Sequence, residues 1–240
     1  MVMRELSALD GAILVDKPAG PTSHDVVDAI RRRFALKKVG HCGTLDPGAT
    51  GLLIIVLGRG TKLSEKLMAS DKVYEGRIVF GRATDTYDAE GQTTEIKPVP
   101  PLTLAGLNAE AEKFEGDLLQ TPPMVSAVKQ GGVPLYKLAR KGLEVERKPR
   151  LVHIYRFRFV TYEEPAGSFR IACTKGTYVR SIAHELGIKL GCGAHLGSLR
   201  RVGSGRFDVA EAVPLADILQ WTTPELEKRT IPFFQLARME

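Results

Sequence analysis

Asp46 is the residue of this 240-residue chain whose setting most suggests chemistry. It lies in the stretch VGHCGTLDPGATGLLIIVLG, residues 39–58, in a turn with glycines on both sides and directly before a continuous hydrophobic run. A carboxylate held in such a turn can act as a nucleophile or as a base. An Asp-Pro pair followed by glycine is also common in ordinary turns. Asp46 by itself therefore leaves both interpretations open.

Two other polar residues stand beside recognisable elements. Tyr74 lies in KVYEGRIVFG, which alternates like a strand, and Arg180 lies in TKGTYVRS, at the start of a helical pattern. Taken singly, Tyr74 is an ordinary strand aromatic and Arg180 an ordinary cation at a helix start. Their importance depends on the motifs that surround them.

Other motifs that could carry chemistry fail on inspection. DTYDAEG at residues 85–91 lacks the alternating acids and the distant glutamate of a calcium-binding EF-hand. The stretch GRGTK at residues 58–62 is not a phosphate-binding Walker loop, and no serine lies in GxSxG. A zinc site drawn from two residue pairs lacks CxxC or HxxxH spacing; the four residues are His41, Cys42, Cys192 and His195.

The composition is that of an ordinary soluble globular protein, with 43% hydrophobic and 26% charged residues. No apolar run is long enough to span a bilayer, and the N-terminus lacks a signal-peptide core. The three cysteines include no CxxC pair. Since structural disulfides belong to oxidising compartments, we expect a protein of the reducing cytoplasm, not bound to a membrane.

The positive charge is gathered in three separate clusters. The formal net charge is +6 and the pI about 9.2, which is a mild basic excess. Residues 31–38 and 195–206 contain no acid, and residues 146–150 contain one. Each run alone could be a solvated helix face or loop. Three of them in a chain of this length favour a polyanionic partner.

Hydrophobic periodicity predicts strands and helices in mixed order. Thr22 and Asp25 have capping-box spacing, which predicts a helix start. Because there is no regular βαβ rhythm, the pattern favours an α+β fold with a mainly antiparallel sheet and flanking helices. One predicted helical stripe consists of Leu104, Leu107, Ala111 and Phe114. The predicted helices span residues 22–34, 102–116 and 178–191, and the predicted strands begin near residue 11 and span 51–58, 73–81, 151–164 and 168–176.

Residues from about 120 to 150 interrupt this pattern. The stretch contains prolines, a Gly-Gly pair and many cations, with only a short amphipathic patch. A long loop inside a compact domain is usually functional. We therefore interpret it as an inserted arm over a binding face.

Four motifs in this order resemble the bacterial TruB family, the tRNA pseudouridine 55 synthases. They are GHCGTLDPGATGLL, KVYEGRIVFGRATDTYDAEG, QTPPMVSAVKQGGVPLYKLARKG and CTKGTYVRSIAHELGIKLGCGAHLGSLRRVGSGRF, and the resemblance runs from about Gly11 to about Phe207. It implies the pseudouridine-synthase fold in a single catalytic domain over residues 1–240, with the 120–150 arm as a thumb loop. It further implies isomerisation of uridine 55 in the T-loop of tRNA, with no metal and no organic cofactor.

The resemblance also implies roles for individual residues. Asp46 matches the catalytic aspartate, Tyr74 the active-site tyrosine that lies against the target base, and Arg180 the arginine that pairs with the aspartate. His41 matches a histidine that packs against the RNA where the base has left its stack. The other residues for which the resemblance implies contact with substrate or RNA are Lys17, Lys129, Tyr136, Lys175, Tyr178 and Leu199.

The chemistry of this reaction suits these residue types. A C–N glycosidic bond is broken, the uracil turns, and it is rejoined through carbon. Asp46 must be ionised to attack C6, to attack the sugar C1′ or to remove the C2′ proton, and a cation such as Arg180 favours the ionised form. The sequence does not choose among these three routes. The uridine must leave its stack, so a filler such as His41 has a physical role.

The chain departs from the family pattern in two places. Cys42 stands where Thr or Ser is usual, and we expect it to pack without thiol chemistry. After Phe207 only about thirty residues follow, so we expect the C-terminal RNA-binding module of the PUA type, found in longer relatives, to be absent.

Three alternatives remain open. One is a guide-RNA-dependent synthase of the archaeal and eukaryotic branch, which also carries GTLDP. The second is an RNA-binding or RNA-folding protein with an inactive site, and the third is a phosphate-binding small-molecule enzyme. The PGATG sequence of the aspartate motif favours a stand-alone bacterial synthase. For such an enzyme we expect the tRNA T-arm as partner, no guide RNA and a monomer.

Overall fold

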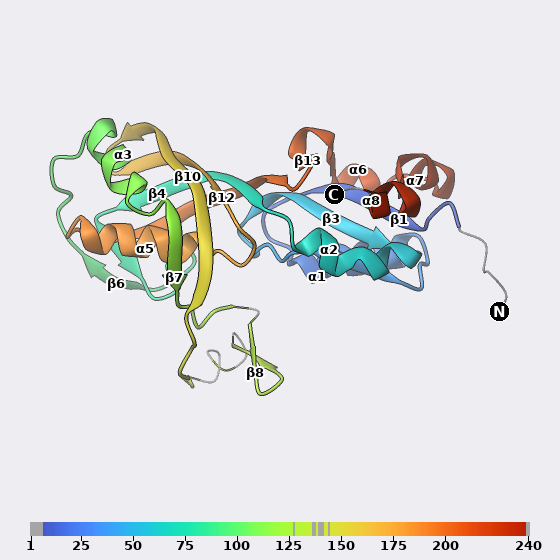
Figure 1. The fold of residues 1–240 in the computed structure, drawn as a ribbon, viewed down its shortest axis with the longest axis horizontal. Coiled ribbons are helices and arrows are strands. Elements are labelled where there is room, and N and C mark those ends of the chain that lie inside the picture. The colour runs from blue at the N-terminus through green and yellow to red at the C-terminus, as the bar shows by residue number, and fades with distance from the viewer. Residues whose placement is uncertain (1–6, 127, 136–137, 139–141, 144, 239–240) are drawn as a thin grey trace. The chain divides into compact units, whose positions relative to one another are not determined.

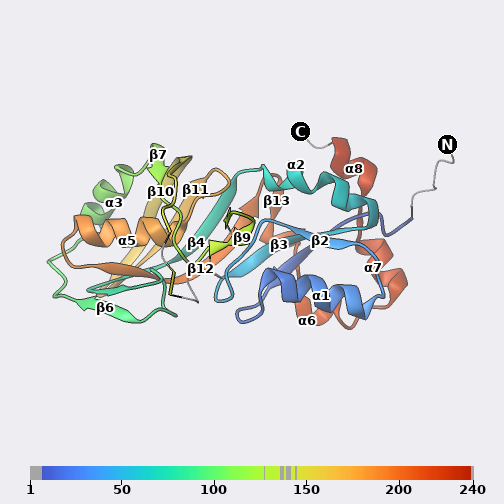
Figure 2. The same ribbon diagram turned by 90° about the horizontal axis from the view of Figure 1, so that it is seen from below.

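The computed structural model describes residues 7–126, 128–135, 138, 142–143 and 145–238. The chain divides into two compact units, unit 1 made of Met1–Ser70 with Arg200–Glu240, and unit 2 made of Asp71–Leu199. Figures 1 and 2 show the elements of each unit. The hydrophobic pattern did not indicate this division. That the two units form a single catalytic domain stays a prediction.

Unit 1 is built around β3 (Thr50–Leu57), the predicted hydrophobic strand, which is almost entirely buried. Strand β1 (Gly11–Lys17) pairs with it antiparallel along its whole length. On the other side, β2 (Val39–Cys42) pairs antiparallel, and the end of β12 (Ala194–Ser204) pairs in parallel. A run that is apolar throughout suits a strand covered on both faces. The other elements are η1 (Gly58–Leu63), α2 (Ser64–Met68), β13 (Phe207–Asp208), η2 (Val209–Glu211), β14 (Val213–Pro214), α6 (Leu215–Ile218), α7 (Thr223–Arg229), β15 (Ile231–Pro232) and α8 (Phe233–Arg238).

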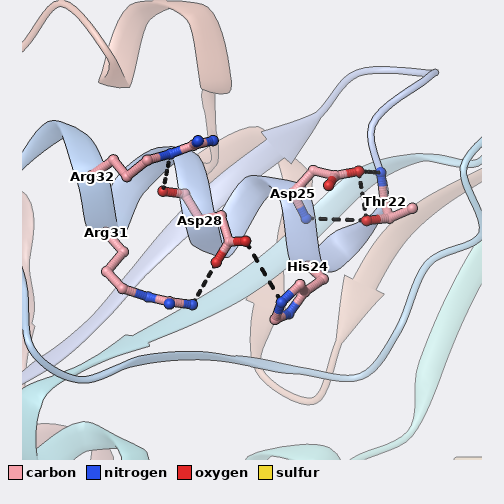
Figure 3. A network of polar contacts seen from close by, with 6 residues as sticks. All are labelled: Thr22, His24, Asp25, Asp28, Arg31 and Arg32. Carbon is pink, nitrogen blue, oxygen red and sulfur yellow. Dashed lines mark hydrogen bonds and ion pairs between the residues drawn. The ribbon is translucent and has the colours of Figure 1, made fainter.

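Helix α1 (Ser23–Arg33) confirms the predicted capping box. The Thr22 hydroxyl accepts from the Asp25 N–H, and the Asp25 carboxylate accepts from the Thr22 N–H, as Figure 3 shows. The Thr22 hydroxyl also donates to the Asp25 carboxylate at 2.7 Å, and this bond, together with that from the Thr22 N–H, holds the pKa of Asp25 below its usual value because both favour the ionised carboxylate. Further along, Asp28 pairs with Arg31 at 2.5 Å. The fixed helix start sets the position of Ser23, and the buried face of the helix is Val26, Val27 and Ile30.

Unit 2 contains four strands in antiparallel succession. They lie in the order β4 (Lys72–Phe80), β11 (Ala166–Cys173), β10 (Arg150–Glu163) and β7 (Gly116–Gln120). Strand β12 is the neighbour of β4 on the other side. Separately, β5 (Arg82–Thr84) and β6 (Thr93–Ile96) form a two-stranded sheet, joined by the turn at residues 85–91.

Two helices share one hydrophobic core with this sheet. They are α3 (Leu104–Glu112) and α5 (Val179–Lys189). The predicted stripe on the first helix is largely correct, since Leu107, Ala111 and Phe114 are buried. The expectation for Leu104 was wrong: it is 39% exposed, because it is the first residue of the helix and lies one turn before the buried part.

The arm leaves the sheet at the end of β7 and returns at the start of β10 (Figure 1). Its described residues contain one short hairpin, β8 (Lys129–Gln130) with β9 (Val133–Pro134). Arg147 Nη1 donates to the Pro122 carbonyl at 3.1 Å, which ties the two ends of the arm together. The closing of this arm on RNA stays a prediction.

The predicted α+β class with a mainly antiparallel sheet is confirmed. Among the strand registers described, only β1 with β14 and β3 with β12 run parallel. In the described part of the chain, no helix is long and apolar enough to cross a membrane.

Candidate active site

The loop that carries Asp46 is held at the residues on either side of it. The Ser23 hydroxyl accepts from the Leu45 N–H at 2.8 Å and donates to the Leu45 carbonyl at 3.1 Å. The Gly20 N–H donates to the Pro47 carbonyl at 2.9 Å. The Asp46 side chain between them stays partly exposed. A carboxylate is thus presented from a backbone that cannot easily shift, which is what precise chemistry requires.

Lys17 is a buried cation that binds the backbone of the Asp46 loop. Its side chain is fully buried, and Nζ donates to the Pro18 carbonyl at 2.8 Å and to the Pro47 carbonyl at 3.0 Å. An ammonium is buried only where its hydrogen bonds are supplied by the protein. The predicted RNA contact of Lys17 stays a prediction, but the geometry gives this residue a positioning role that the sequence did not indicate.

Arg201 is a second buried cation beneath the loop. Its Nε donates to the Leu52 carbonyl at 2.7 Å and its Nη2 to the Gly43 carbonyl at 3.1 Å. Gly51 lies against the Arg201 backbone, where a Cβ would come within 2.3 Å of the carbonyl oxygen, and its φ of +97° also requires glycine. One of the glycines that frame Asp46 is therefore needed for close packing.

His41 lies on β2, opposite Ile55 of β3. Burial lowers the pKa of His41 below its usual value, and the nearby charge of Arg201 lowers it further. The imidazole is therefore neutral at neutral pH. A neutral ring suits the predicted role of packing against an unstacked base, which stays a prediction.

Tyr74 and Leu199 pack against the same core in unit 2. Tyr74 lies on β4 opposite Ile171 of β11, and Leu199 lies on β12. Both are partly buried side chains that contact the hydrophobic core of this unit. The structure therefore places these two candidate residues on neighbouring strands of one sheet.

Arg180 is the second residue of α5, and it is only 4% exposed. Its Nη2 donates to the Val125 carbonyl of the arm at 2.9 Å. Its Nη1 donates to the Thr86 carbonyl at 3.2 Å and lies 3.4 Å from Asp88 Oδ2. A buried guanidinium needs such acceptors to offset its lost hydration. Arg180 thus joins the start of α5 to the arm and to the turn at residues 85–91.

Asp88 is a functional candidate that the sequence analysis missed. It belongs to DTYDAEG, whose acids do not have the spacing of a calcium loop. The structure uses this turn differently, since Asp88 Oδ1 accepts from the Thr86 hydroxyl at 2.6 Å and from the Glu90 N–H at 3.1 Å. The second oxygen faces Arg180. The only signal in the sequence was an acid-rich turn without an assigned role.

Gln120 holds the residue at which α5 begins. Its Nε2 donates to the Tyr178 carbonyl at 3.0 Å, and its Oε1 accepts from the Tyr178 N–H at 2.7 Å. Tyr178 is the N-cap residue of α5 and makes no capping bond with its own side chain. The buried Gln120 amide therefore fixes the helix start from which Arg180 projects.

The remaining predicted contacts lie in unit 2. Lys175 is exposed, and Tyr178 is partly buried. Lys129 lies on β8, and Tyr136 falls outside the described residues. Tyr178 is the N-cap of α5, two residues before Arg180, and Lys17, His41 and Asp46 all belong to unit 1. The pairing of Asp46 with Arg180 stays a prediction.

Cys42 packs in the hydrophobic core of unit 1, as predicted. Burial raises the pKa of the Cys173 thiol to about 11, so this cysteine is not a thiolate at neutral pH. Among the residues that the structure describes, no group of three or more His, Cys, Asp or Glu side chains is arranged to hold a metal ion.

Two family models together match residues 31–238, which is most of the chain. The model described as "TruB family pseudouridylate synthase (N terminal domain)" matches residues 31–179, and that described as "tRNA pseudouridylate synthase B C-terminal domain" matches residues 180–238. The chain belongs to the TruB family of pseudouridylate synthases. The second match covers α5, β12 and the C-terminal helices of unit 1. The expected absence of a PUA-type module stays a prediction.

Curated members of the TruB family are similar over most of their length. A protein from Opitutus terrae named tRNA pseudouridine synthase B is 52% identical over 229 residues, which are 95% of this chain and 95% of the relative. A protein of the same name from Syntrophotalea carbinolica is 48% identical, over 90% of this chain and 71% of the relative. These matches confirm the family that the four motifs predicted.

The fold is confirmed by similarity to solved structures. A chain in the crystal structure of a Cbf5–Nop10–Gar1 complex matches with a TM-score of 0.75 and 28% identity, over 95% of this chain and 62% of that chain. A chain in the structure of an H/ACA RNP bound to a substrate RNA containing 2′-deoxyuridine matches with a TM-score of 0.72 and 26% identity, over 95% and 61%. This chain therefore spans about three fifths of those solved chains.

Proposed function

We propose that this protein converts a uridine of tRNA, uridine 55 of the T-loop, into pseudouridine, with Asp46 as the catalytic carboxylate. The observation that carries the proposal is the Asp46 loop. Hydrogen bonds hold both neighbours of Asp46 while its side chain stays partly exposed. Membership of the TruB family and the name of the curated relatives support the reaction type.

Asp46 acts on the uridine in its ionised form. It breaks the C–N glycosidic bond by attack or by proton removal, and the uracil is rejoined to the ribose through C5. Arg180 supplies a cation that favours ionised groups at the reacting base. Tyr74, supported by the core beneath it, lies against the uracil and takes part in proton removal from C5.

The target base must leave its stack to reach Asp46. The neutral imidazole of His41 occupies the space that the base vacates. Lys129, Tyr136, Lys175, Tyr178 and Leu199 contact the T-arm or the base. We expect the protein to act as a cytoplasmic monomer, without a guide RNA and without a metal or organic cofactor.

The test is the substitution Asp46→Asn, assayed for pseudouridine formation and for tRNA binding on the same preparation. Asparagine suits turns as well as aspartate does, so the fold should survive. The amide can neither attack nor accept a proton effectively, so turnover should fall below detection. Binding should persist, because phosphate and stacking contacts elsewhere supply the affinity. Turnover within about tenfold of the unchanged protein, a loss of only about 1.4 kcal/mol, would reject Asp46 as the catalytic group.

The same assay separates the stand-alone enzyme from a guide-dependent one. The solved chains that resemble this protein come from Cbf5-containing and H/ACA assemblies, so a guide requirement is the relevant alternative. Pure protein with an unmodified tRNA transcript, in EDTA and without added RNA, should form pseudouridine. Activity that appears only with a second RNA would support the guide-dependent alternative.

A further inference from the structure

Tyr87 and His184 form a close parallel stack in unit 2. Their ring centroids lie 3.8 Å apart and their planes differ by 14°. Tyr87 belongs to the turn at residues 85–91, and His184 lies on α5. On a helix, residues four apart share a face, so His184 lies one turn beyond Arg180 on the same side. The stack therefore joins α5, which carries Arg180, to the turn whose residues contact the Arg180 guanidinium.

Tyr87 adopts an unfavourable backbone conformation. Its φ is +65°, in the left-handed region that non-glycine residues rarely occupy. Its N–H donates to the Thr84 carbonyl at 3.3 Å, and its carbonyl accepts from the Leu196 N–H at 2.9 Å. A strained residue persists only where its surroundings hold it. The stack on His184 is one of the contacts that hold it.

The two residues that flank Tyr87 both contact Arg180, which also donates to the Val125 carbonyl. The carbonyl of Thr86 accepts from Arg180, and the carboxylate of Asp88 faces it. Any rotation of the backbone at Tyr87 would displace both acceptors. The orientation of Tyr87 is thus linked to the electrostatic surroundings of Arg180.

His184 contributes a ring rather than a charge. Burial lowers the pKa of His184, so the imidazole is neutral at neutral pH. In the part of the chain that the structure describes, its buried Nδ1 has no hydrogen-bond partner. The contact with Tyr87 is therefore ring stacking, which another aromatic ring can reproduce.

We infer that the Tyr87–His184 stack is a positioning pair that fixes the turn at residues 85–91 against α5 and thereby sets the orientation of Arg180 for reaction. The inference rests on the function proposed above. It adds two residues, Tyr87 and His184, whose role in the reaction is exerted through Arg180.

The first test compares His184→Ala with His184→Phe. The alanine variant should lower kcat about tenfold, equivalent to about 1.4 kcal/mol, with KM for tRNA within about twofold. The phenylalanine variant should restore most of the turnover. His153→Ala is the matched control, because His153 also contacts a tyrosine, Tyr155, at a ring distance of 4.8 Å, but it lies on β10 and belongs neither to the turn at residues 85–91 nor to α5. Its kcat should not change.

The second test uses Tyr87→Gly and Tyr87→Phe. Glycine accepts a φ of +65°, so the glycine variant removes the ring without adding backbone strain. It should lose turnover as His184→Ala does, whereas Tyr87→Phe should keep it. Melting temperatures of all variants show whether each is folded at the assay temperature.

A double-mutant cycle with Asp88→Ala tests whether the stack acts through the turn. If it does, His184→Ala should cost far less in the Asp88→Ala background than alone, because coupled residues are not additive. Full additivity, an inactive His184→Phe that is folded, or an equal loss in His153→Ala would overturn the inference. The unchanged protein is assayed in parallel: if it formed no pseudouridine, the proposed function would fail instead.

Discussion

Lys17 is a residue for which two roles can be considered, a contact with RNA and support of the Asp46 loop. In the sequence it is a lone basic residue in a Pro/Gly turn, and the resemblance to the TruB family implies that it contacts substrate or RNA. In the structure its ammonium is buried and donates to two carbonyls, one of them next to Asp46. Charge and position together make it a support for the candidate catalytic loop.

The substitution Lys17→Met should separate the two roles. Methionine keeps the length and apolar character of the side chain but leaves the Pro47 carbonyl without its lysine donor. We expect turnover to fall at least about tenfold, while tRNA affinity stays within about twofold, since Lys17 is not on the surface. Pseudouridine formation and filter binding on one preparation measure both.

Lys228→Met serves as the control for that experiment. Lys228 is an exposed lysine of the same unit, on α7, and its replacement should alter neither quantity. A loss of tRNA affinity in Lys17→Met, with normal turnover at saturating tRNA, would favour the RNA contact instead.

At the scale of elements, α5 depends on a strand far away in sequence for its start. Tyr178 provides no side-chain cap, and the amide of Gln120 at the end of β7 binds both its N–H and its carbonyl. Because Arg180 projects from the first turn, the exact start of this helix determines where the guanidinium lies.

Gln120→Ala should therefore reduce both stability and turnover. Two backbone groups lose their partner, and each buried unsatisfied group costs about 1–3 kcal/mol. The matched control is Asn108→Ala, since the Asn108 amide similarly binds the N–H and carbonyl of Phe159 but supports α3. Thermal unfolding should show both variants destabilised, and only Gln120→Ala should lose turnover below its melting temperature. Equal turnover in the two variants would contradict a role for Gln120 in placing α5.

At the scale of the whole molecule, the net charge of +6 and the basic clusters favour binding to phosphates. The residues proposed to touch RNA belong to the Asp46 loop region, β4, the arm, the segment that leads into α5, and β12. Each of these is expected to contact the T-arm, and none is expected to contact a more distant part of tRNA.

A minimal T-arm stem-loop should accordingly bind this chain nearly as well as whole tRNA. Each phosphate contact contributes about one unit to the slope of log affinity against log salt, so the two RNAs should give the same slope. Titrations at several salt concentrations measure both quantities. Whole tRNA binding more than about tenfold tighter, or about 1.4 kcal/mol, would show contacts beyond the T-arm.

The local features of this protein were predictable because their causes are local. The capping box of Thr22 and Asp25 involves residues that are three positions apart. The continuous apolar composition of residues 51–57 by itself predicts that β3 is a buried strand. The same holds for the strand that carries Tyr74 and for the helix that carries Arg180. Four co-linear motifs then identified the family, and with it the candidate residues.

The tertiary structure decided how those residues are supported. Gln120 meets Tyr178 across 58 positions of sequence, and Val125 meets Arg180 across 55. Strand order and packing determine which distant groups become neighbours. The periodicity of side chains along the sequence predicts neither of them. The sequence therefore determined the family, the fold class and the candidate carboxylate. Only the folded chain revealed the buried Lys17 beside Asp46 and the Asp88 turn around Arg180, because both arise from long-range packing.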